Sequence, residues 1–253
     1  MGEALIAGLL AQGWASPDEL RVVEVVGARA DELRKQYAGV EVASAPTAAD
    51  GHVVAVKPHD AATACAALAS AAPRSPVLSI AAGVTIAQLE GALAPGTPVV
   101  RAMPNTPALV GAGAAAIAPG RHATDDELSW AESILGAVGT VVRLDESLLD
   151  AVTGLSGSGP AYVFLVTEAL IEAGVLAGLP RPVSSTLATQ TVVGAARLLA
   201  ESGDTAEVLR AAVTSPGGTT AAGLRELERA GVRAAFLDAV VAATERSRQL
   251  GRS

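Results

Sequence analysis

The feature that most constrains the fold is the alternation of short β-rich runs with helical runs over residues 1–145. Helical patterns fit between most of these runs, and strands separated by helices typically form βαβ crossovers within a largely parallel sheet. We therefore expect an α/β domain. The predicted strands are residues 21–26, 40–42, 52–56, 77–80, 99–102, 114–118 and 140–144.

The pattern changes near residues 144–147, after which only long helical periods remain. We expect an all-helical second half and place the domain boundary there, giving domains 1–145 and 146–253. The predicted helices are residues 161–179, 182–201, 205–213, 219–230 and 234–250.

Composition narrows the class of protein. Half of the residues are hydrophobic, whereas Phe, Tyr and Trp number two each, so the core must be built from aliphatic side chains and close-packed Ala and Gly. The net charge is −8 and neither half is basic, which argues against nucleic acid or an acidic lipid surface as a partner. Cys65 is the only cysteine, so no disulfide framework or cysteine-based metal site is expected within one chain. We expect a buried, inert thiol, with a reactive thiol as the alternative.

The longest uncharged stretch, residues 102–120, is interrupted by prolines and glycines, and we therefore expect no membrane span. The chain also shows no secretion or myristoylation signal, which favours the cytoplasm.

The first residues, MGEALIAGLLAQGW, read as a helix that begins at residue 1, whereas a βαβ unit begins with a strand. Gly2 stands where the glycine-rich turn of a dinucleotide-binding fold would end. We expect the first strand and most of the phosphate loop to be missing from this chain, and Met1 to be an internal methionine of a longer product.

Two basic residues are candidates for binding a ligand. No carboxylate follows the strand at 21–26, and Arg29 lies close behind it, which favours a 2′-phosphate and hence NADP over NAD. Lys57 follows the strand at 52–56, at the end where α/β proteins bind ligands. The alternatives are a solvated helix-start residue for Arg29 and a surface amine for Lys57.

Small residues precede two predicted helices, in LSGSGPAY at 155–162 and TSPGGTT at 214–220. Free backbone N–H groups at such a position can bind an anion. Plain helix capping is the alternative.

Five segments taken together resemble the pyrroline-5-carboxylate reductase family over essentially the whole chain. They are AVKP at 55–58, AAGVTI at 81–86, RAMPNTP at 101–107, DAVTGLSGSGPAY at 150–162 and SPGGTT at 215–220. The resemblance implies reduction of L-1-pyrroline-5-carboxylate to L-proline by NADPH, with NADH as an alternative donor, as the last step of proline biosynthesis. It also implies a Rossmann-like domain followed by a helical domain that forms a homodimer, stacked into decamers in some members.

The resemblance also implies roles for individual residues. Thr220 matches the threonine that hydrogen-bonds the imine nitrogen and is the expected catalytic residue, while Glu146 matches a position that contacts substrate or product. A carboxylate at a helix start is the alternative for Glu146. The expected substrate-binding set is Glu146, Ser215, Gly217, Gly218, Thr219 and Thr220. The expected cofactor-binding set is Gly2, Arg29, Ala55, Val56, Lys57, Pro58, Ala81, Ala82, Gly83 and Asn105.

Some features depart from the family pattern or favour a rival. Two asparagines that some members use are replaced here by Ala45 and Ala212. A β-hydroxyacid dehydrogenase relative would need a lysine in its helical domain, and no lysine follows Lys57. A non-catalytic remnant that cannot bind cofactor is the second alternative.

Overall fold

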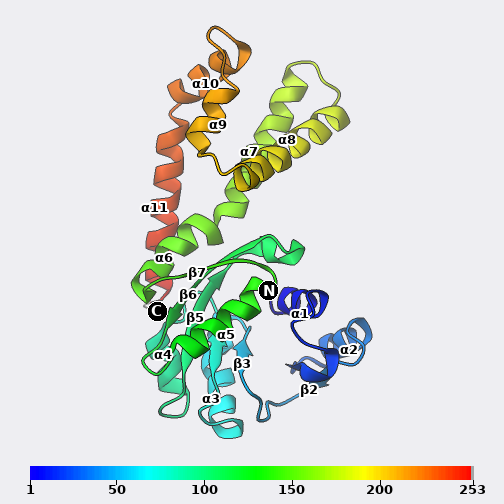
Figure 1. Ribbon diagram of the computed structural model, residues 1–253, viewed down its shortest axis with the longest axis vertical. Helices are drawn as coiled ribbons and strands as arrows, with labels where there is room; N and C mark the ends of the chain where they lie inside the picture. Colours follow the sequence, from blue (N-terminus) through cyan, green and yellow to red (C-terminus); the bar gives the residue numbers. More distant parts are fainter. Residues whose placement is uncertain (252–253) are drawn as a thin grey trace. The chain divides into compact units, whose positions relative to one another are not determined.

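The computed structural model describes residues 1–251 and divides the chain into two compact units. The first unit contains Met1–Ser158 together with the chain from Val241 onward, and the second contains Gly159–Val240 (Figure 1). The packing therefore changes at Ser158, somewhat later in the chain than the pattern change near residue 145. The functional domains 1–145 and 146–253 stay predictions.

A five-stranded sheet forms the centre of the first unit, in the order β3-β4-β5-β6-β7. Neighbouring strands are parallel except for β5 and β6, which are antiparallel. The mostly parallel sheet predicted from the sequence is thus confirmed. Its strands are β3 (His52–Val54), β4 (Val77–Ser79), β5 (Val99–Pro104), β6 (Gly113–Pro119) and β7 (Gly139–Arg143).

The first two strands, β1 (Arg21–Val23) and β2 (Glu41–Ala43), form a separate two-stranded parallel sheet. Within residues 1–251, no strand joins β1 to β3. β1 is also shorter than the predicted run 21–26, and the side chains of Val25 and Val26 are exposed. Because a two-stranded sheet buries little apolar surface, β1 receives little support beyond its pairing with β2.

Helices accompany the strands as expected, and the first of them begins at Gly2. Side chains define two of the helix starts. Thr85 caps α4 in a capping box with Gln88, and Thr124 caps α5 in a capping box with Glu127. The helices are α1 (Gly2–Ala11), α2 (Gly27–Gln36), α3 (Ala61–Ala71), α4 (Ile86–Ala92) and α5 (Asp125–Gly136), and the short 3₁₀ turns are η1 (Pro17–Glu19), η2 (Pro58–Asp60), η3 (Thr106–Val110) and η4 (Glu146–Leu148).

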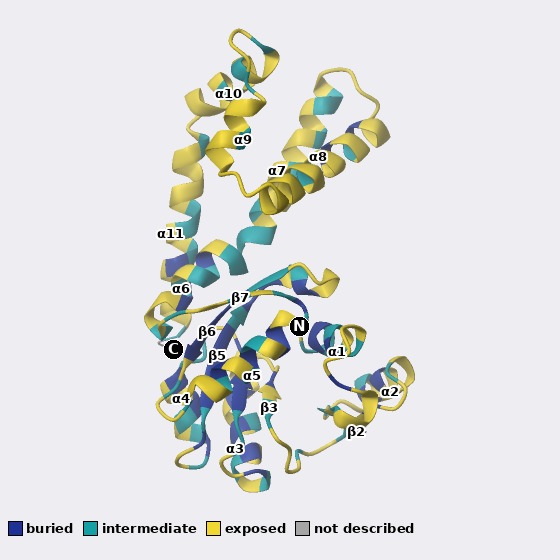
Figure 2. Cartoon of the chain, in the orientation of Figure 1, coloured by how far each residue is buried: buried dark blue, intermediate teal, exposed yellow. Residues whose placement is uncertain are grey.

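The core of this unit is aliphatic, as the composition predicts, and Leu78 and Ile117 are fully buried between strands and helices (Figure 2). Cys65 is also fully buried, and burial raises the pKa of its thiol, which favours the unreactive protonated form. Gly113 and Gly139 face each other in the register of β6 and β7. A Cβ atom on Gly139 would lie 2.0 Å from the carbonyl oxygen of Gly113, so only glycine allows this backbone approach.

The rest of the chain is helical, as predicted. A helical run leads out of the first unit through α6 (Leu149–Val152) and a wide π turn, η5 (Thr153–Gly157). The helices that follow are α7 (Gly159–Leu176), α8 (Arg181–Glu201), α9 (Ala206–Ala212), α10 (Thr219–Arg229) and α11 (Val232–Leu250).

One expected helix start is wrong. Residues 155–157 lie inside the helical run instead of ahead of it, and the amide of Ser158 donates to the carbonyl oxygen of Thr153 at 2.9 Å, five residues earlier. The small residues here widen a helix that has already begun, so they do not offer the free amides of a new helix.

The run Glu146–Leu176 is long and apolar enough to cross a membrane by length and composition, with a mean hydropathy of 1.4. Within the second unit the apolar side chains of α7 are largely exposed, including Phe164, Leu165 and Leu176. α7 packs against the next helix, α8, and the Ser184 hydroxyl of α8 donates to the Ile171 carbonyl of α7 at 2.7 Å.

Candidate active site

The predicted cofactor residues gather largely at one edge of the five-stranded sheet. β3, β4 and β5 are parallel, so their carboxyl ends lie at the same edge, where α/β proteins bind their ligands. The start of α1 belongs to the same place, because a Cβ atom on Gly2 would lie 3.0 Å from the Cβ of Ala55. The residues that follow these strand ends are Ala55, Val56, Lys57, Pro58, Ala81, Ala82, Gly83 and Asn105.

The segment after β3 is accessible to a ligand, since residues 55–58 are all exposed. Among the residues that the structure describes, no carboxylate forms an ion pair with Lys57. The segment after β4 is tighter: Ala81 is buried, and Gly83 adopts a left-handed φ of +78° as the chain turns into α4. A free ammonium beside small, close-packed residues suits an anionic, flat ligand.

Arg29 lies on α2, behind β1, and its guanidinium is already engaged. Nη1 donates to Glu32 Oε2 at 2.7 Å, and Nη2 donates to Glu3 of α1. The hydrogen bonds to Glu32 and Glu3 raise the pKa of Arg29. A phosphate at this position would compete with two carboxylates, so the predicted role of Arg29 depends on exchange of these partners.

Asn105 is buried and uses both ends of its amide on the main chain. Nδ2 donates to the carbonyl oxygen of Ser156 at 3.0 Å, and Oδ1 accepts from the amide of Ala114 at 2.8 Å. The side chain thus connects the end of β5 to the start of β6 and to the π turn. Its predicted role as a cofactor ligand stays untested.

Glu146 accepts two hydrogen bonds on one oxygen. Arg101 Nη1 donates to Oε1 at 2.8 Å, and the backbone amide of Ile86 donates to the same atom at 2.7 Å. The carboxylate therefore neutralises a buried guanidinium and stabilises the first turn of α4, a helix other than its own. Its predicted contact with substrate stays a prediction.

A cavity of about 300 Å³ opens beside these residues in the first unit. This volume is at the lower end of the range for small-molecule sites. Sequence reasoning did not select Arg101, Asp150 or Arg248, although a charge inside the apolar run VVRAMP was a signal for Arg101. The lining residues are Gly83, Thr85, Arg101, Asp150, Arg248 and Gly251.

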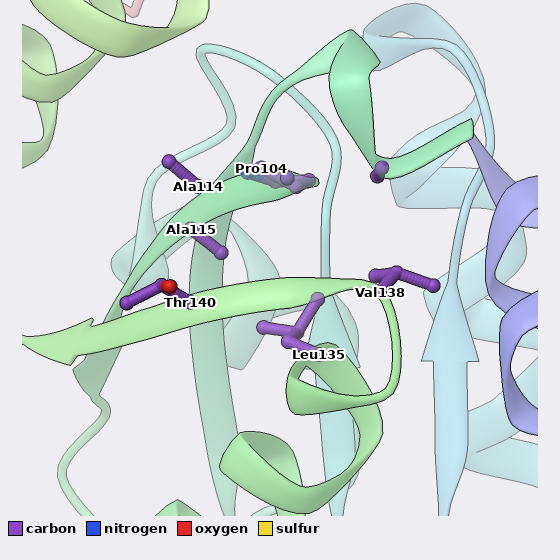
Figure 3. A pocket seen from close by; sticks show the side chains of 8 residues that line it. Pro104, Ala114, Ala115, Leu135, Val138 and Thr140 are labelled. Atoms are coloured by element: carbon purple, nitrogen blue, oxygen red, sulfur yellow. The ribbon is translucent and has the colours of Figure 1, made fainter. Parts of the chain in front are cut away.

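A second, apolar pocket lies between the ends of β5 and β6 and α5 (Figure 3). Its side chains include Pro104, Ala115 and Leu135, and its volume is about 10 Å³. That is hardly the room of one water molecule, so this pocket is a packing defect and not a ligand site.

In the second unit, the segment SPGGTT forms a tight turn that leads into α10. Gly217 has a left-handed φ of +70°, and the amide of Gly218 donates to the carbonyl oxygen of Ser215 at 3.0 Å. A Cβ atom on Gly218 would lie 2.4 Å from the Ser215 hydroxyl oxygen. The positive φ of Gly217 therefore favours glycine, and a side chain at Gly218 would crowd Ser215.

The start of α10 is open to an anion. Gly218 is its N-cap, no side chain caps it, and its first turn contains no acidic residue. The helix's own geometry leaves the amides of Thr219, Thr220 and Ala221 without an intrahelical acceptor, and both threonine side chains are exposed. The structure thus brings together the predicted set Ser215, Gly217, Gly218, Thr219 and Thr220, which can bind a carboxylate through backbone amides.

Within residues 1–251, no group of three or more His, Cys, Asp or Glu side chains is arranged to hold a metal ion.

Comparison with known families gives matches over both parts of the chain. Residues 146–250 match the family described as pyrroline-5-carboxylate reductase dimerisation. Residues 1–83 match the family described as NADP oxidoreductase, coenzyme F420-dependent.

Similar proteins cover nearly the whole chain. A pyrroline-5-carboxylate reductase of Synechocystis is 46% identical over 255 residues, which span 100% of this chain and 95% of that protein. The enzyme of the same name from Mycobacterium tuberculosis is 48% identical over 277 residues, spanning 99% and 93% of the two chains.

Solved structures of proteins with the same name are also similar to this chain. A pyrroline-5-carboxylate reductase from Coxiella burnetii has a TM-score of 0.93 at 37% identity, covering 98% of this chain and 94% of that one. A Plasmodium falciparum pyrroline carboxylate reductase with NADP bound has a TM-score of 0.84 at 30% identity, covering 99% and 94%.

Proposed function

Since this chain belongs to the pyrroline-5-carboxylate reductase family, we propose that it reduces L-1-pyrroline-5-carboxylate to L-proline, the last step of proline biosynthesis, with NADPH, or alternatively NADH, as the reductant. The observation that carries the proposal is the start of α10, which is uncapped, free of acidic residues and preceded by the turn that Gly217 and Gly218 allow. The substrate has one carboxylate, and the start of α10 can bind one carboxylate.

The turn at Ser215–Gly218 and the amides that follow it bind the substrate carboxylate. Because these donors are fixed by the backbone, they hold the ring in one orientation at little entropic cost. Thr219 and Thr220 occupy the first positions of α10, next to the bound acid.

Thr220 donates its hydroxyl to the ring nitrogen and is the catalytic residue. An alcohol is a weak acid at neutral pH, so Thr220 positions the imine or relays a proton, and the proton comes from a protonated imine or from water. This role requires an accessible hydroxyl, and the Thr220 side chain is exposed.

The residues at the carboxyl edge of β3 and β4 fit an NADP cofactor. Lys57 has no carboxylate partner in the described part of the chain and supplies charge for a phosphate, while the small residues 81–83 allow close approach. Arg29 binds the 2′-phosphate by exchanging Glu3 or Glu32 for it. When bound, the reduced nicotinamide supplies the hydride that converts the C=N bond to an amine.

The second unit is the dimerisation element. Its helices leave large apolar side chains exposed, and residues 146–250 match a dimerisation family. We infer that a second copy of the chain covers these side chains in a homodimer, which can stack into a decamer, and that the protein works in the cytoplasm without a membrane or nucleic-acid partner. Sedimentation of the purified chain without detergent tests this, with a dimer or larger as the expected result.

The comparisons do not favour a non-catalytic remnant, because relatives named as reductases match the chain over its whole length. A β-hydroxyacid dehydrogenase mechanism is also not favoured, because it needs a lysine in the helical domain and no lysine follows Lys57.

The direct test is NADPH oxidation by the purified chain with pyrroline-5-carboxylate, with proline measured by amino-acid analysis. We expect turnover, and a loss of about 10-fold to 100-fold in kcat for Thr220→Ala. Thr186→Ala is the matched control, because Thr186 donates to its own helix in α8. Wild-type turnover that Thr220→Ala leaves unchanged would remove Thr220 from this role, and absence of proline would contradict the function.

A further inference from the structure

A proline inside the helical run creates a defined need for a hydrogen-bond donor. Pro160 is the second residue of α7, and the run before it is already helical through Gly157. In a continuous helix, the carbonyl oxygen of Ser156 would accept from the amide of residue 160. Proline has no N–H group, so this partly buried carbonyl loses the donor that a regular helix would provide.

Asn105 supplies that donor from another part of the chain. Its Nδ2 donates to the Ser156 carbonyl oxygen at 3.0 Å, while its Oδ1 accepts from the Ala114 amide at 2.8 Å. Asn105 is 9% exposed and is the only asparagine in the sequence. A side-chain amide can donate to a carbonyl through its NH₂ group and accept from an N–H through its oxygen at the same time.

The hydroxyl groups nearby do not replace it. Thr153 Oγ1 donates to the Leu149 carbonyl at 2.9 Å, and Ser156 Oγ donates to the Val152 carbonyl at 3.2 Å. Both hydroxyls therefore serve earlier carbonyls of the same run. The wide turn at Thr153–Gly157 is held from outside by Asn105.

We propose that Asn105 is a positioning residue, and not a cofactor ligand, that fixes the π turn at Thr153–Gly157 by replacing the donor that Pro160 lacks. The turn is the last part of the first unit before α7 begins, and Asn105 follows β5 at the edge where the cofactor residues gather. One side chain thus connects the edge where the cofactor residues gather to the turn that precedes α7. The effect on turnover rests on the proposed reductase function, whereas the effect on the turn does not.

The first experiment compares Asn105→Ala in the wild-type chain with Asn105→Ala in a Pro160→Ala chain, in which the Ser156 carbonyl no longer needs the Asn105 donor. Hydrogen exchange of the Ser158 amide, which donates to Thr153 across the π turn, reports whether the turn is held. We expect Asn105→Ala to speed this exchange about tenfold or more, because the partly buried Ser156 carbonyl then has no donor. Pro160→Ala restores an N–H for Ser156, so adding Asn105→Ala to it should change exchange much less. An equal effect of Asn105→Ala in both backgrounds would overturn the proposal.

The second experiment uses the protonation of an isosteric side chain. In Asn105→Asp, only the protonated carboxyl can donate to Ser156, while the ionised form faces the carbonyl with a negative charge. We expect the kcat of this variant, relative to wild type, to recover as the pH falls, whereas the ratio for Asn105→Ala stays flat. A flat ratio for Asn105→Asp would contradict the proposal.

Cofactor affinity separates positioning from binding. The dissociation constant for NADPH should stay within about twofold of wild type in Asn105→Ala. A large rise in that constant, with Ser158 exchange unchanged, would make Asn105 a cofactor ligand and overturn the proposal. If the wild-type chain showed no turnover, the proposed function would fail, and the exchange comparison would still decide the role of Asn105 in the turn.

Discussion

The buried guanidinium of Arg101 donates to Glu146 Oε1 at 2.8 Å, and this pair connects β5 to the first residues after β7. The Arg101 side chain is 9% exposed and that of Glu146 is 34% exposed. The same Glu146 oxygen accepts the amide of Ile86, so a single carboxylate orders both a strand and the start of α4. That helix directly follows the predicted cofactor segment 81–83.

Glu146→Ala should lower the free energy of unfolding by about 1–3 kcal/mol, because it leaves a buried guanidinium without a counter-charge. Urea unfolding of the purified chain measures this. Asp145→Ala is the matched control, since the carboxylate of this neighbouring residue is exposed and makes no cap hydrogen bond to η4. Equal stability of the two variants would show that the pair contributes nothing.

Arg29 should govern the choice between the two nicotinamide cofactors. Arg29→Ala is expected to raise KM for NADPH about tenfold or more and to change KM for NADH little, since one charge-assisted contact to a phosphate is lost. Arg34→Ala, on the same helix but paired with Asp31, is the control. If both variants changed KM for the two cofactors equally, Arg29 would not contact the 2′-phosphate.

Glu127 should make part of the stability of α5 depend on pH. Hydrogen bonds from the side chain and backbone of Thr124 lower the pKa of Glu127 below its ordinary 4.5. A lowered folded-state pKa means that this stabilisation is present above the unfolded-state value and is lost as the pH falls through the folded-state value.

Glu127→Gln keeps a capping box but does not titrate. The stability advantage of wild type over this variant should therefore shrink as the pH falls below about 4.5. Thermal unfolding at several pH values measures it, and an advantage that does not change with pH would contradict the assignment.

Amide exchange should differ between the two sheets of the first unit. β1 pairs only with β2 among the described strands, whereas β4 is buried and paired on both sides. We expect the amides of Val22 and Val23 to exchange much faster than that of Leu78. Similar protection in both strands would mean that β1 has support that this arrangement does not provide.

The sequence predicted the order and type of the elements well because hydrophobic periodicity is a local signal. Each predicted strand and helix is present, with ends that shift by a few residues. β1 is shorter than predicted because Val25 and Val26 are exposed and have no core to pack against. Whether such residues extend a strand depends on the neighbouring strands and not only on their own propensity.

The geometry of the candidate site could be predicted only where it depends on contiguous residues. The turn at Ser215–Gly218 could be predicted because its glycines serve a local backbone geometry. The contacts of Glu146 with Arg101 and of Asn105 with Ser156 join residues 45 and 51 positions apart, and no local pattern indicates such partners. The error at residues 155–157 has a local origin, because small residues suit a widened helix as well as a helix start.

The central claim is that backbone amides at the start of α10 hold the carboxylate of the substrate. A crystal structure of the chain with L-proline bound tests it most directly. We predict the proline carboxylate within hydrogen-bond distance of the amides of Thr219 and Thr220, beside the turn that Gly217 forms. A carboxylate bound elsewhere, with these amides facing only solvent, would contradict the account.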